Sequence, residues 1–365
     1  MSRHLPHEPW APTLLWRLLA VCLAVGGIAT ATALRSDVQR PSPPGTASVP
    51  GGPRGEPEAF HPQPVGSGRL LPDVFRVSDV DASPEGWVIL DGQGGHASLV
   101  DTGGRFGPTV GRRGDGPGEL RAPIAVARSG SAIGVLDASG LRLDVFPADT
   151  APPFRVSLAP AACPAAFGVD LDADATGWIV LRRCLGTAQV RVEVLRVALL
   201  GGHSKVLDER ALGPALPLDP FLGAILFTRT RSDVYLGSTR TPCLTRIEGT
   251  GERELCLESG PPVPLTDSLR RLYTGWAERS ERAGFATVLP SHLPPWLEVR
   301  DAGHALAVLR PSVGSGEGWV LIETGREHVI EPPNGTRVEP GPAGLLLLRH
   351  EPEGVRAWIV ASPGG

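Results

Sequence analysis

A short, wholly apolar segment recurs six times along the chain, usually just after a glycine and a turn. The copies lie at 85–90, 131–136, 176–181, 233–236, 303–309 and 343–348, so that successive copies start about 40 to 70 residues apart. A β-strand has this composition when both of its faces are covered by other parts of the protein. The pattern therefore predicts six buried strands in a repeated unit.

Other extended segments flank these buried strands. Short runs precede the first three copies at 75–81, 123–127 and 167–171, and alternating apolar and polar segments follow at 97–100, 141–146, 191–197 and 244–248. Four strands in a unit of 40–50 residues is typical of a propeller blade. We therefore expect an all-β, six-bladed propeller over residues 69–365. The last unit lacks an outer strand, which residues 66–73 could supply to close the ring. A β-sandwich or two smaller β domains is the alternative, because neither needs a fixed period.

The most specific motif lies within residues 111–146. It begins Gly-Arg-Arg-Gly-Asp-Gly-Pro-Gly-Glu-Leu, continues with Pro123 and Asp137, and ends Leu-Arg-Leu-Asp-Val-Phe. This segment resembles the repeat of NHL-type six-bladed propellers, and Asp91 keeps part of the pattern one unit earlier. The resemblance implies the fold but not a function, because one fold carries many functions. We expect the glycines to form a turn, and Arg142 to pair with a carboxylate between blades.

The first 68 residues have a different character. Residues 18–34 are uncharged and end in small residues that fit an A-x-A cleavage site, so residues 1–35 are expected to be a signal peptide or a transmembrane anchor. Residues 36–68 are rich in Pro, Gly and Ser, which predicts a disordered linker. The propeller would then lie outside the cytoplasm, periplasmic or secreted, and either free or held to the inner membrane by residues 18–34.

Four cysteines follow the leader, and an even number in an exported domain indicates disulfides. Cys243 and Cys256 flank a hairpin turn at residues 249–250, and counting outward from that turn places them directly opposite each other. Cys163 precedes the first strand of the third unit, and Cys184 lies at the end of the second strand of the same unit. Antiparallel pairing of these two strands should therefore bring the two cysteines together. A zinc site is the alternative, but it would need C-x-x-C or nearby histidines.

Residues 266–284 interrupt the β pattern. Leu269, Leu272, Tyr273 and Trp276 have the i, i+3, i+4, i+7 spacing of one helix face. The segment is therefore expected to be a short helical insertion. It either packs on the rim of the ring or, through Arg270, Tyr273 and Trp276, docks a partner.

The sequence contains no recognisable catalytic set. The histidines form no paired motif, there is no Gly-x-Ser-x-Gly elbow, and no catalytic residue or cofactor is predicted. The net charge of −4 gives no reason to expect nucleic acid. Some six-bladed propellers are hydrolases that hold a channel calcium ion with Glu, Asp and Asn. The single asparagine here, Asn334, lies in a Pro-Asn-Gly turn, so a calcium site would consist of carboxylates and carbonyls alone. The candidate residues are Asp79, Asp81, Asp170, Asp172 and Asp174.

Three functional hypotheses follow. The first is a non-catalytic binding module for a protein, peptide or glycan. The second is a propeller hydrolase or lyase with a metal ion in its channel. The third is a structural subunit of a cell-envelope assembly. The sequence does not identify the ligand under any of these hypotheses.

Overall fold

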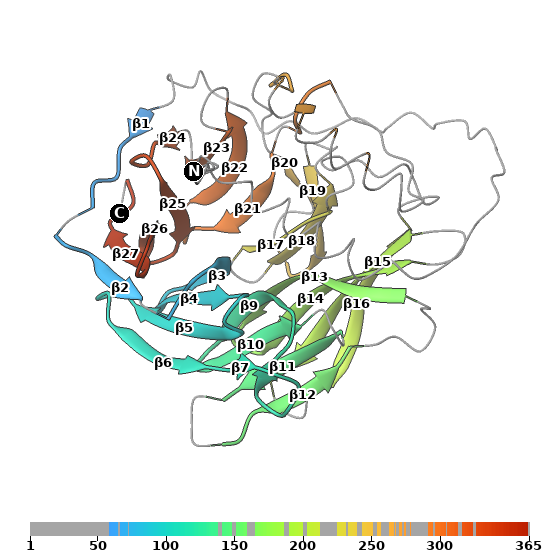
Figure 1. Ribbon diagram of the computed structural model, residues 1–365. Helices are drawn as coiled ribbons and strands as arrows, with labels where there is room; N and C mark the ends of the chain where they lie inside the picture. Colours follow the sequence, from blue (N-terminus) through green and yellow to red (C-terminus); the bar gives the residue numbers. More distant parts are fainter. Residues whose placement is uncertain are drawn as a thin grey trace, which may run out of the picture.

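The computed structural model describes residues 58–363 with the exception of short gaps. The gaps are 65, 72, 138–140, 148–150, 159–164, 186–189, 200–202, 212–224, 231–232, 239–242, 251–253, 257–262, 266, 268–269, 272–273, 275–277, 279–290, 295, 304, 313–315 and 324–325. Most of the described strands form six sheets around a common centre, in which consecutive strands of each blade pair antiparallel (Figure 1). The chain is therefore a six-bladed β-propeller.

Each of the first three blades has four strands that follow one another in the chain. Blade 1 is β3 (Val77–Ser83), β4 (Gly86–Asp91), β5 (His96–Asp101) and β6 (Phe106–Val110). Blade 2 is β9 (Pro123–Ser129), β10 (Ala132–Asp137), β11 (Arg142–Phe146) and β12 (Phe154–Ser157). Blade 3 is β13 (Ala165–Asp174), β14 (Gly177–Leu185), β15 (Val190–Ala198) and β16 (Ser204–Ala211). A two-stranded pair, β7 (Arg112–Arg113) and β8 (Glu119–Leu120), lies in the connection between blades 1 and 2.

Blade 4 again consists of four consecutive strands, whereas blades 5 and 6 each add a strand from the N-terminal part of the described chain. Blade 4 is β17 (Ile225–Thr230), β18 (Asp233–Ser238), β19 (Cys243–Glu248) and β20 (Glu254–Cys256). Blade 5 is β21 (Glu298–Asp301), β22 (Leu306–Ser312), β23 (Gly316–Glu323) and β24 (Arg326–Ile330), with β1 (Glu58–Phe60) added outside. Blade 6 is β25 (Thr336–Gly341), β26 (Gly344–Glu351), β27 (Gly354–Val360) and β2 (Arg69–Leu71).

The six predicted apolar segments all become the second strand of a blade, which confirms the repeat. These strands are apolar because neighbouring blades cover both of their faces; Ile89, Leu136 and Leu181, for example, have no exposed surface. The prediction for blade 5 began three residues too early. Ala302 donates its N–H to the carbonyl of Ala305, and Gly303 has a φ of +80°, so this stretch is a turn and β22 starts at Leu306.

The N-terminal segment closes the ring as predicted. Strand β2 pairs antiparallel with β27, so that Leu71 lies opposite Val355, and it supplies the outer strand that the final unit lacks. Figure 1 shows β2 beside β27. The first and last parts of the propeller thus share one sheet, which leaves no open edge at the junction.

Part of the predicted disordered linker is ordered, which corrects that prediction for residues 58–60. Strand β1 pairs in parallel with β24, so that Glu58 lies opposite His328 and Phe60 opposite Ile330. Phe60 also packs against the apolar core between blades 5 and 6. A spacer composition did not indicate this strand, because the three residues Glu-Ala-Phe become a strand only when an outer edge is present to pair with them.

Tryptophans fill the spaces between blades by packing on glycines. Trp178 of blade 3 lies against Gly134 of blade 2, where an added Cβ would be 2.3 Å from the indole nitrogen. Trp87 of blade 1 lies in the same way against Gly341 of blade 6, at 3.1 Å from such a Cβ. Both tryptophans are fully buried. The two glycines are therefore part of the packing between blades, because a side chain at either position would collide with the tryptophan indole.

The predicted insertion starts and ends at a narrow neck. The N–H of Leu265 donates to the carbonyl of Ser291, the N–H of Leu293 donates to the carbonyl of Val263, and Pro264 bridges to His292. Of the predicted helix, the structure describes only five exposed residues, Arg270 among them. Tyr273 and Trp276 lie outside the described residues, so the helix and its docking role stay predictions.

The leader, residues 1–35, also lies outside the described residues, as does most of the predicted linker. Within the described ranges, no helix is long and apolar enough to cross a bilayer.

Candidate functional site in the central channel

The inner strands of the six blades surround one cavity. Strands β3, β9, β13, β17, β21 and β25 contact one another in sequence around the ring. The space between them is about 610 Å³, including the part that is open to solvent. The residues that line it lie mostly in the middle and the second half of the inner strands, so the cavity occupies one part of the channel.

Two of the predicted acidic segments meet in this cavity. Residues 79–82 (Asp-Val-Asp-Ala) in β3 and 170–173 (Asp-Leu-Asp-Ala) in β13 occupy equivalent positions in blades 1 and 3, because Ala82 pairs with Trp87 as Ala173 pairs with Trp178. All four aspartates line the cavity. Asp174 does not, since it binds Thr176 at the turn and the guanidinium of Arg196.

The aspartates of blade 1 are bound to the backbone of blade 2. Asp79 Oδ2 accepts the N–H of Val126 at 2.9 Å, and Asp81 Oδ2 accepts the N–H of Arg128 at 2.8 Å. These residues are spaced by two in both strands, so their side chains and N–H groups face each other in register. The blade 1 pair therefore joins two blades as well as lining the cavity.

Asp172 of blade 3 has a different partner. Its Oδ1 accepts the Nε–H of Arg229, from β17 of blade 4, at 3.3 Å and the N–H of Ala173 at 2.6 Å. Burial lowers the pKa of Arg229, but the nearby carboxylates, Asp172 foremost, outweigh it, and the pKa lies above its usual range. Arg229 is thus a permanent cation on the wall of the cavity.

Arg300 of β21 reaches across three blades. It donates to the carbonyl of Val80 in blade 1 at 3.0 Å and to Glu339 Oε2 in blade 6 at 2.5 Å, and it also pairs with Glu298 of its own strand. Burial lowers its pKa, but Glu298 and Glu339 raise it more, so the net shift is upward. Arg300 therefore ties blade 5 to blades 6 and 1 and remains charged.

The cavity has more acidic than basic groups. Two guanidinium groups, Arg229 and Arg300, stand among six carboxyl groups on its wall: Asp79, Asp81, Asp170, Asp172, Glu298 and Asp301. The excess of carboxyl groups contributes to the high proton affinity of Asp81. Burial, and next the charge of Asp172, raise the pKa of Asp81 to about 8, while the N–H of Arg128 and the charge of Arg300 oppose the rise. Burial also raises the pKa of Asp172, against the effect of Arg229. At neutral pH the Asp81 carboxyl therefore holds a proton.

Among the described residues of the cavity, the carboxylate oxygens do not converge as calcium ligands would. Calcium needs six to eight converging oxygen atoms, whereas oxygens of Asp79, Asp81 and Asp172 are engaged with N–H donors of the protein. Within the described residues, the one group of three or more His, Cys, Asp or Glu side chains whose donor atoms lie close together is Cys243, Glu254 and Cys256 in the outer part of blade 4, and the two cysteines of this group are joined in a disulfide. The channel-metal hypothesis has no support from this arrangement.

Sequence reasoning found the aspartates but not their arginine partners or the acids of blade 5. Arg229, Glu298 and Arg300 lie in the extended runs that directly precede the fourth and fifth buried strands. The inner strands of blades 1 and 3 hold the aspartates, so the signal that could have found these residues was that every run directly before a buried strand is an inner strand that faces the channel.

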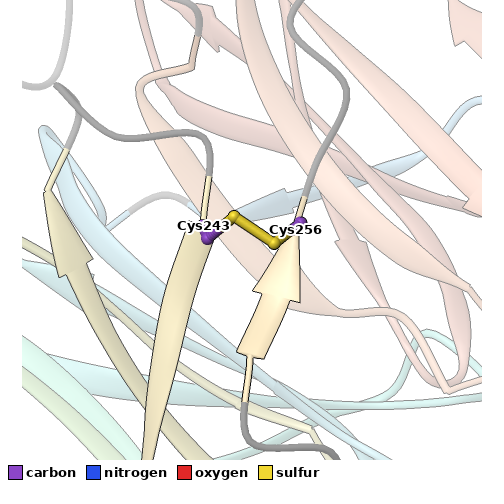
Figure 2. The surroundings of a disulfide bond; sticks show 2 residues. All are labelled: Cys243 and Cys256. Carbon is purple, nitrogen blue, oxygen red and sulfur yellow. A yellow bond between two sulfur atoms is a disulfide. The ribbon is translucent and has the colours of Figure 1, made fainter. Parts of the chain in front are cut away.

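The predicted disulfide of blade 4 is present. Cys243 lies directly opposite Cys256 in the β19–β20 pair, with 4.0 Å between the Cα atoms, and the two sulfurs are bonded (Figure 2). Cys184 is also disulfide-bonded and fully buried. Cys163 lies outside the described residues, so its pairing with Cys184 stays a prediction.

The glycine-rich motif has a structural role. Arg142 donates to the carbonyl of Glu119 at 3.2 Å, and pairs with Asp137 at 3.3 Å and Asp144 at 3.0 Å. Its carboxylate partners belong to blade 2 itself, so the expected pairing between blades was wrong. Asp137 and Asp144 are buried, and Arg142 together with Arg155, which pairs with Asp144, balances their charge, while Arg142 also holds the end of the loop.

Comparisons with known proteins bear on the fold. No protein-family model matches the chain, so the NHL-type resemblance is not confirmed. No curated protein sequence matches it either.

Solved structures that resemble this one have low sequence identity. A luciferin-regenerating enzyme is 10% identical, with 83% of this chain and 96% of that chain covered and a TM-score of 0.43. An inactive variant of virginiamycin B lyase from Staphylococcus aureus is 11% identical, with 81% and 87% covered and a TM-score of 0.40. The β-propeller domain of a protein from Myceliophteria thermophila is 13% identical, with 82% and 99% covered and a TM-score of 0.40. These likenesses carry no argument about function, and the fold rests on the strand order.

Proposed function

We propose that this protein is an extracytoplasmic, non-catalytic binding module whose central channel takes a positively charged group of its ligand. The observation that carries the proposal is the cavity among the inner strands, where six carboxyl groups face two guanidinium groups. A ligand that brings an ammonium or guanidinium group would replace the proton on Asp81 and relieve the repulsion between Asp81 and Asp172.

The location follows from the predicted leader and is compatible with the disulfides. Cys243–Cys256 and the bonded Cys184 are expected outside the cytoplasm, where thiols become oxidised. Fractionation of cells that express the full chain, with a protease-protection assay, tests this part. A chain that stays in the cytoplasm with reduced cysteines would exclude an exported role.

Calorimetric titration of the full chain with spermidine at low salt tests the binding site. We expect saturable binding that weakens with added salt, and about tenfold weaker binding in Asp172→Asn, because one carboxylate is lost from the wall. Asp208→Asn, on the outer strand β16, is the matched control and should bind as the wild type does. A neutral diol of similar length should not bind.

A second measurement separates binding in the channel from binding elsewhere on the surface. If the cation displaces the proton of Asp81, binding near pH 7 releases that proton, and the apparent enthalpy changes with the ionisation enthalpy of the buffer. Asp81→Asn should bind without this proton release. Equal binding in all variants, or no proton release in the wild type, would overturn the channel as the site.

A hydrolase or lyase is the second candidate, and the protonated Asp81 favours it. A carboxylic acid that keeps its proton at neutral pH, beside a second carboxyl group on the same wall, is an arrangement suited to general acid–base catalysis. The engaged aspartates argue against a channel metal, so this activity would be metal-independent. Turnover of an ester, lactone or glycoside that is lost in Asp81→Asn and retained with a chelator would favour this candidate over the binding module.

A further inference from the structure

The outer hairpin of blade 4 places the two sulfurs of a disulfide and one carboxyl group on one face, and reduction of the disulfide would make all three metal-binding groups. Cys243 lies opposite Cys256, and Glu254 lies opposite Thr245, two residues before Cys256 on the same strand. Residues two apart in a strand point to the same side. The two sulfurs and a carboxylate oxygen of Glu254 accordingly lie within 4.8 Å of one another.

The three groups are accessible from solvent. Cys256 and Glu254 are exposed, and Cys243 is half-buried. Cys184, by contrast, has no exposed surface. Because a reductant must reach a sulfur atom to attack it, the bridge in blade 4 is the more open of these positions to reduction. Figure 2 shows this bridge spanning the two strands.

We propose that reduction of the Cys243–Cys256 bridge turns this hairpin into a zinc site, with two thiolates and the carboxylate of Glu254 as ligands and water as the fourth. A dithiol reductant supplies the two electrons and leaves as its own disulfide, and the S–S bond becomes two thiols. Zinc then displaces both thiol protons to solvent and forms two Zn–S bonds. No net oxidation or reduction accompanies the metal-binding step.

The hairpin geometry suits this ligand set. Zinc bonds thiolate sulfur at about 2.3 Å and carboxylate oxygen at about 2.0–2.2 Å in a tetrahedron, so its two sulfurs are about 3.8 Å apart. Directly opposite residues of an antiparallel pair have Cβ atoms about 4.5–5.5 Å apart, so rotation of the two thiols can reach that separation. Thiolates also select zinc over calcium or magnesium. The outer strand of blade 4 would thus be cross-linked in both redox states, by a disulfide or by a metal.

The test uses the full chain, reduced with a phosphine that adds no thiol of its own and becomes its oxide with oxygen from water. After removal of the reductant without air, the protein is titrated with Co²⁺ and then with Zn²⁺. We expect the reduced wild type to bind one metal ion more than the oxidised protein does. We also expect the intense absorption of tetrahedral cobalt–thiolate coordination, which Zn²⁺ should displace.

Variants assign the ligands. Cys256→Ser should lose the additional metal ion, and Glu254→Gln should weaken its binding about tenfold or more. Glu209→Gln, an exposed glutamate on the outer strand of blade 3, is the matched control and should have no effect. Zinc should also raise the unfolding temperature of the reduced wild type, and less so that of Glu254→Gln.

Three results would overturn the proposal. The first is that reduction adds no bound metal. The second is that Cys256→Ser binds as much metal as the wild type, which would place the ion at other cysteines. The third is unchanged affinity in Glu254→Gln, which would remove the carboxylate from the site. Circular dichroism of each reduced variant shows whether the blades are intact, so that loss of the fold is not read as loss of a ligand.

Discussion

Asp81 should make the stability of the propeller fall as the pH rises through neutrality. Its pKa is about 8 in the folded protein and near 3.8 in the unfolded chain, because burial and Asp172 act only after folding. Between these values the folded state binds one proton more than the unfolded state does. The contribution of Asp81 to the free energy of unfolding is therefore fully present below about pH 4 and is lost as the pH rises to about 8.

The size of the effect follows from the slope. A difference of one bound proton changes the free energy of unfolding by about 1.4 kcal/mol for each pH unit. Between about pH 5 and about pH 7 this amounts to about 3 kcal/mol, which is a large part of the stability of an ordinary domain. In Asp81→Asn the neutral amide replaces the protonated acid, so this titration disappears. The variant should have a flatter profile and exceed the wild type in stability above about pH 8.

Urea unfolding of both proteins across this pH range measures the difference. Other groups titrate in the same window, His350 among them, whose pKa burial lowers. Groups that do not interact with Asp81 contribute equally to both proteins and cancel in the difference, whereas the coupled titration of Asp172 belongs to the effect that is measured. Asp101→Asn, at an exposed position in the same blade, is the control and should keep the wild-type slope. If Asp81→Asn and the wild type lose stability in parallel, Asp81 does not carry the proton and the electrostatic description of the cavity is wrong.

Three further predictions concern the ring itself. Gly134→Ala should reduce the free energy of unfolding by about 1–3 kcal/mol, because the new Cβ meets the Trp178 indole at 2.3 Å; Gly318→Ala, where nothing lies within 4 Å, should change it little in the same urea experiment. Arg142→Ala should cost about 3–5 kcal/mol by leaving the buried carboxylate of Asp137 without its cation, while Asp144 keeps its pair with Arg155; lysine should restore only part of this, as thermal unfolding would show. A chain that starts at residue 61 lacks β1 but keeps β2 and should still close the ring, whereas one that starts at residue 72 also lacks β2 and should melt lower or aggregate. Equal melting of these two chains would contradict the closure by β2.

The blade pattern could be predicted because the first three strands of every blade follow one another in the sequence. A second strand is covered on both faces in every blade, so its apolar composition marks it without knowledge of the neighbours. The pairing of Cys243 with Cys256 could be predicted for a similar reason, since the register of a hairpin follows from the position of its turn. The closing strand could be predicted because the last unit of the sequence has only three strands, whereas a blade requires four.

The channel could be predicted only in part. The aspartates were visible as clusters, but the cations that act on them come from other blades: Arg229 of blade 4 bonds to Asp172, and the charge of Arg300 of blade 5 acts on Asp81. The pairing of Arg300 with Val80 joins positions 220 residues apart. Strand β1 was missed for a comparable reason, since it pairs with β24 far along the chain. Arg142 was assigned to the wrong side, because composition does not say which of several carboxylates a long side chain reaches.

The sequence by itself determined the number of blades, the identity of their buried strands, the strand that closes the ring and the disulfide of blade 4. Each of these follows from short-range periodicity or from a count between neighbouring elements. Only the tertiary structure decided which charges share the channel, that Asp81 holds a proton at neutral pH, and that part of the linker is a strand. These depend on the distances between strands brought together by closure of the ring, where burial and charge combine in ways that no local pattern records.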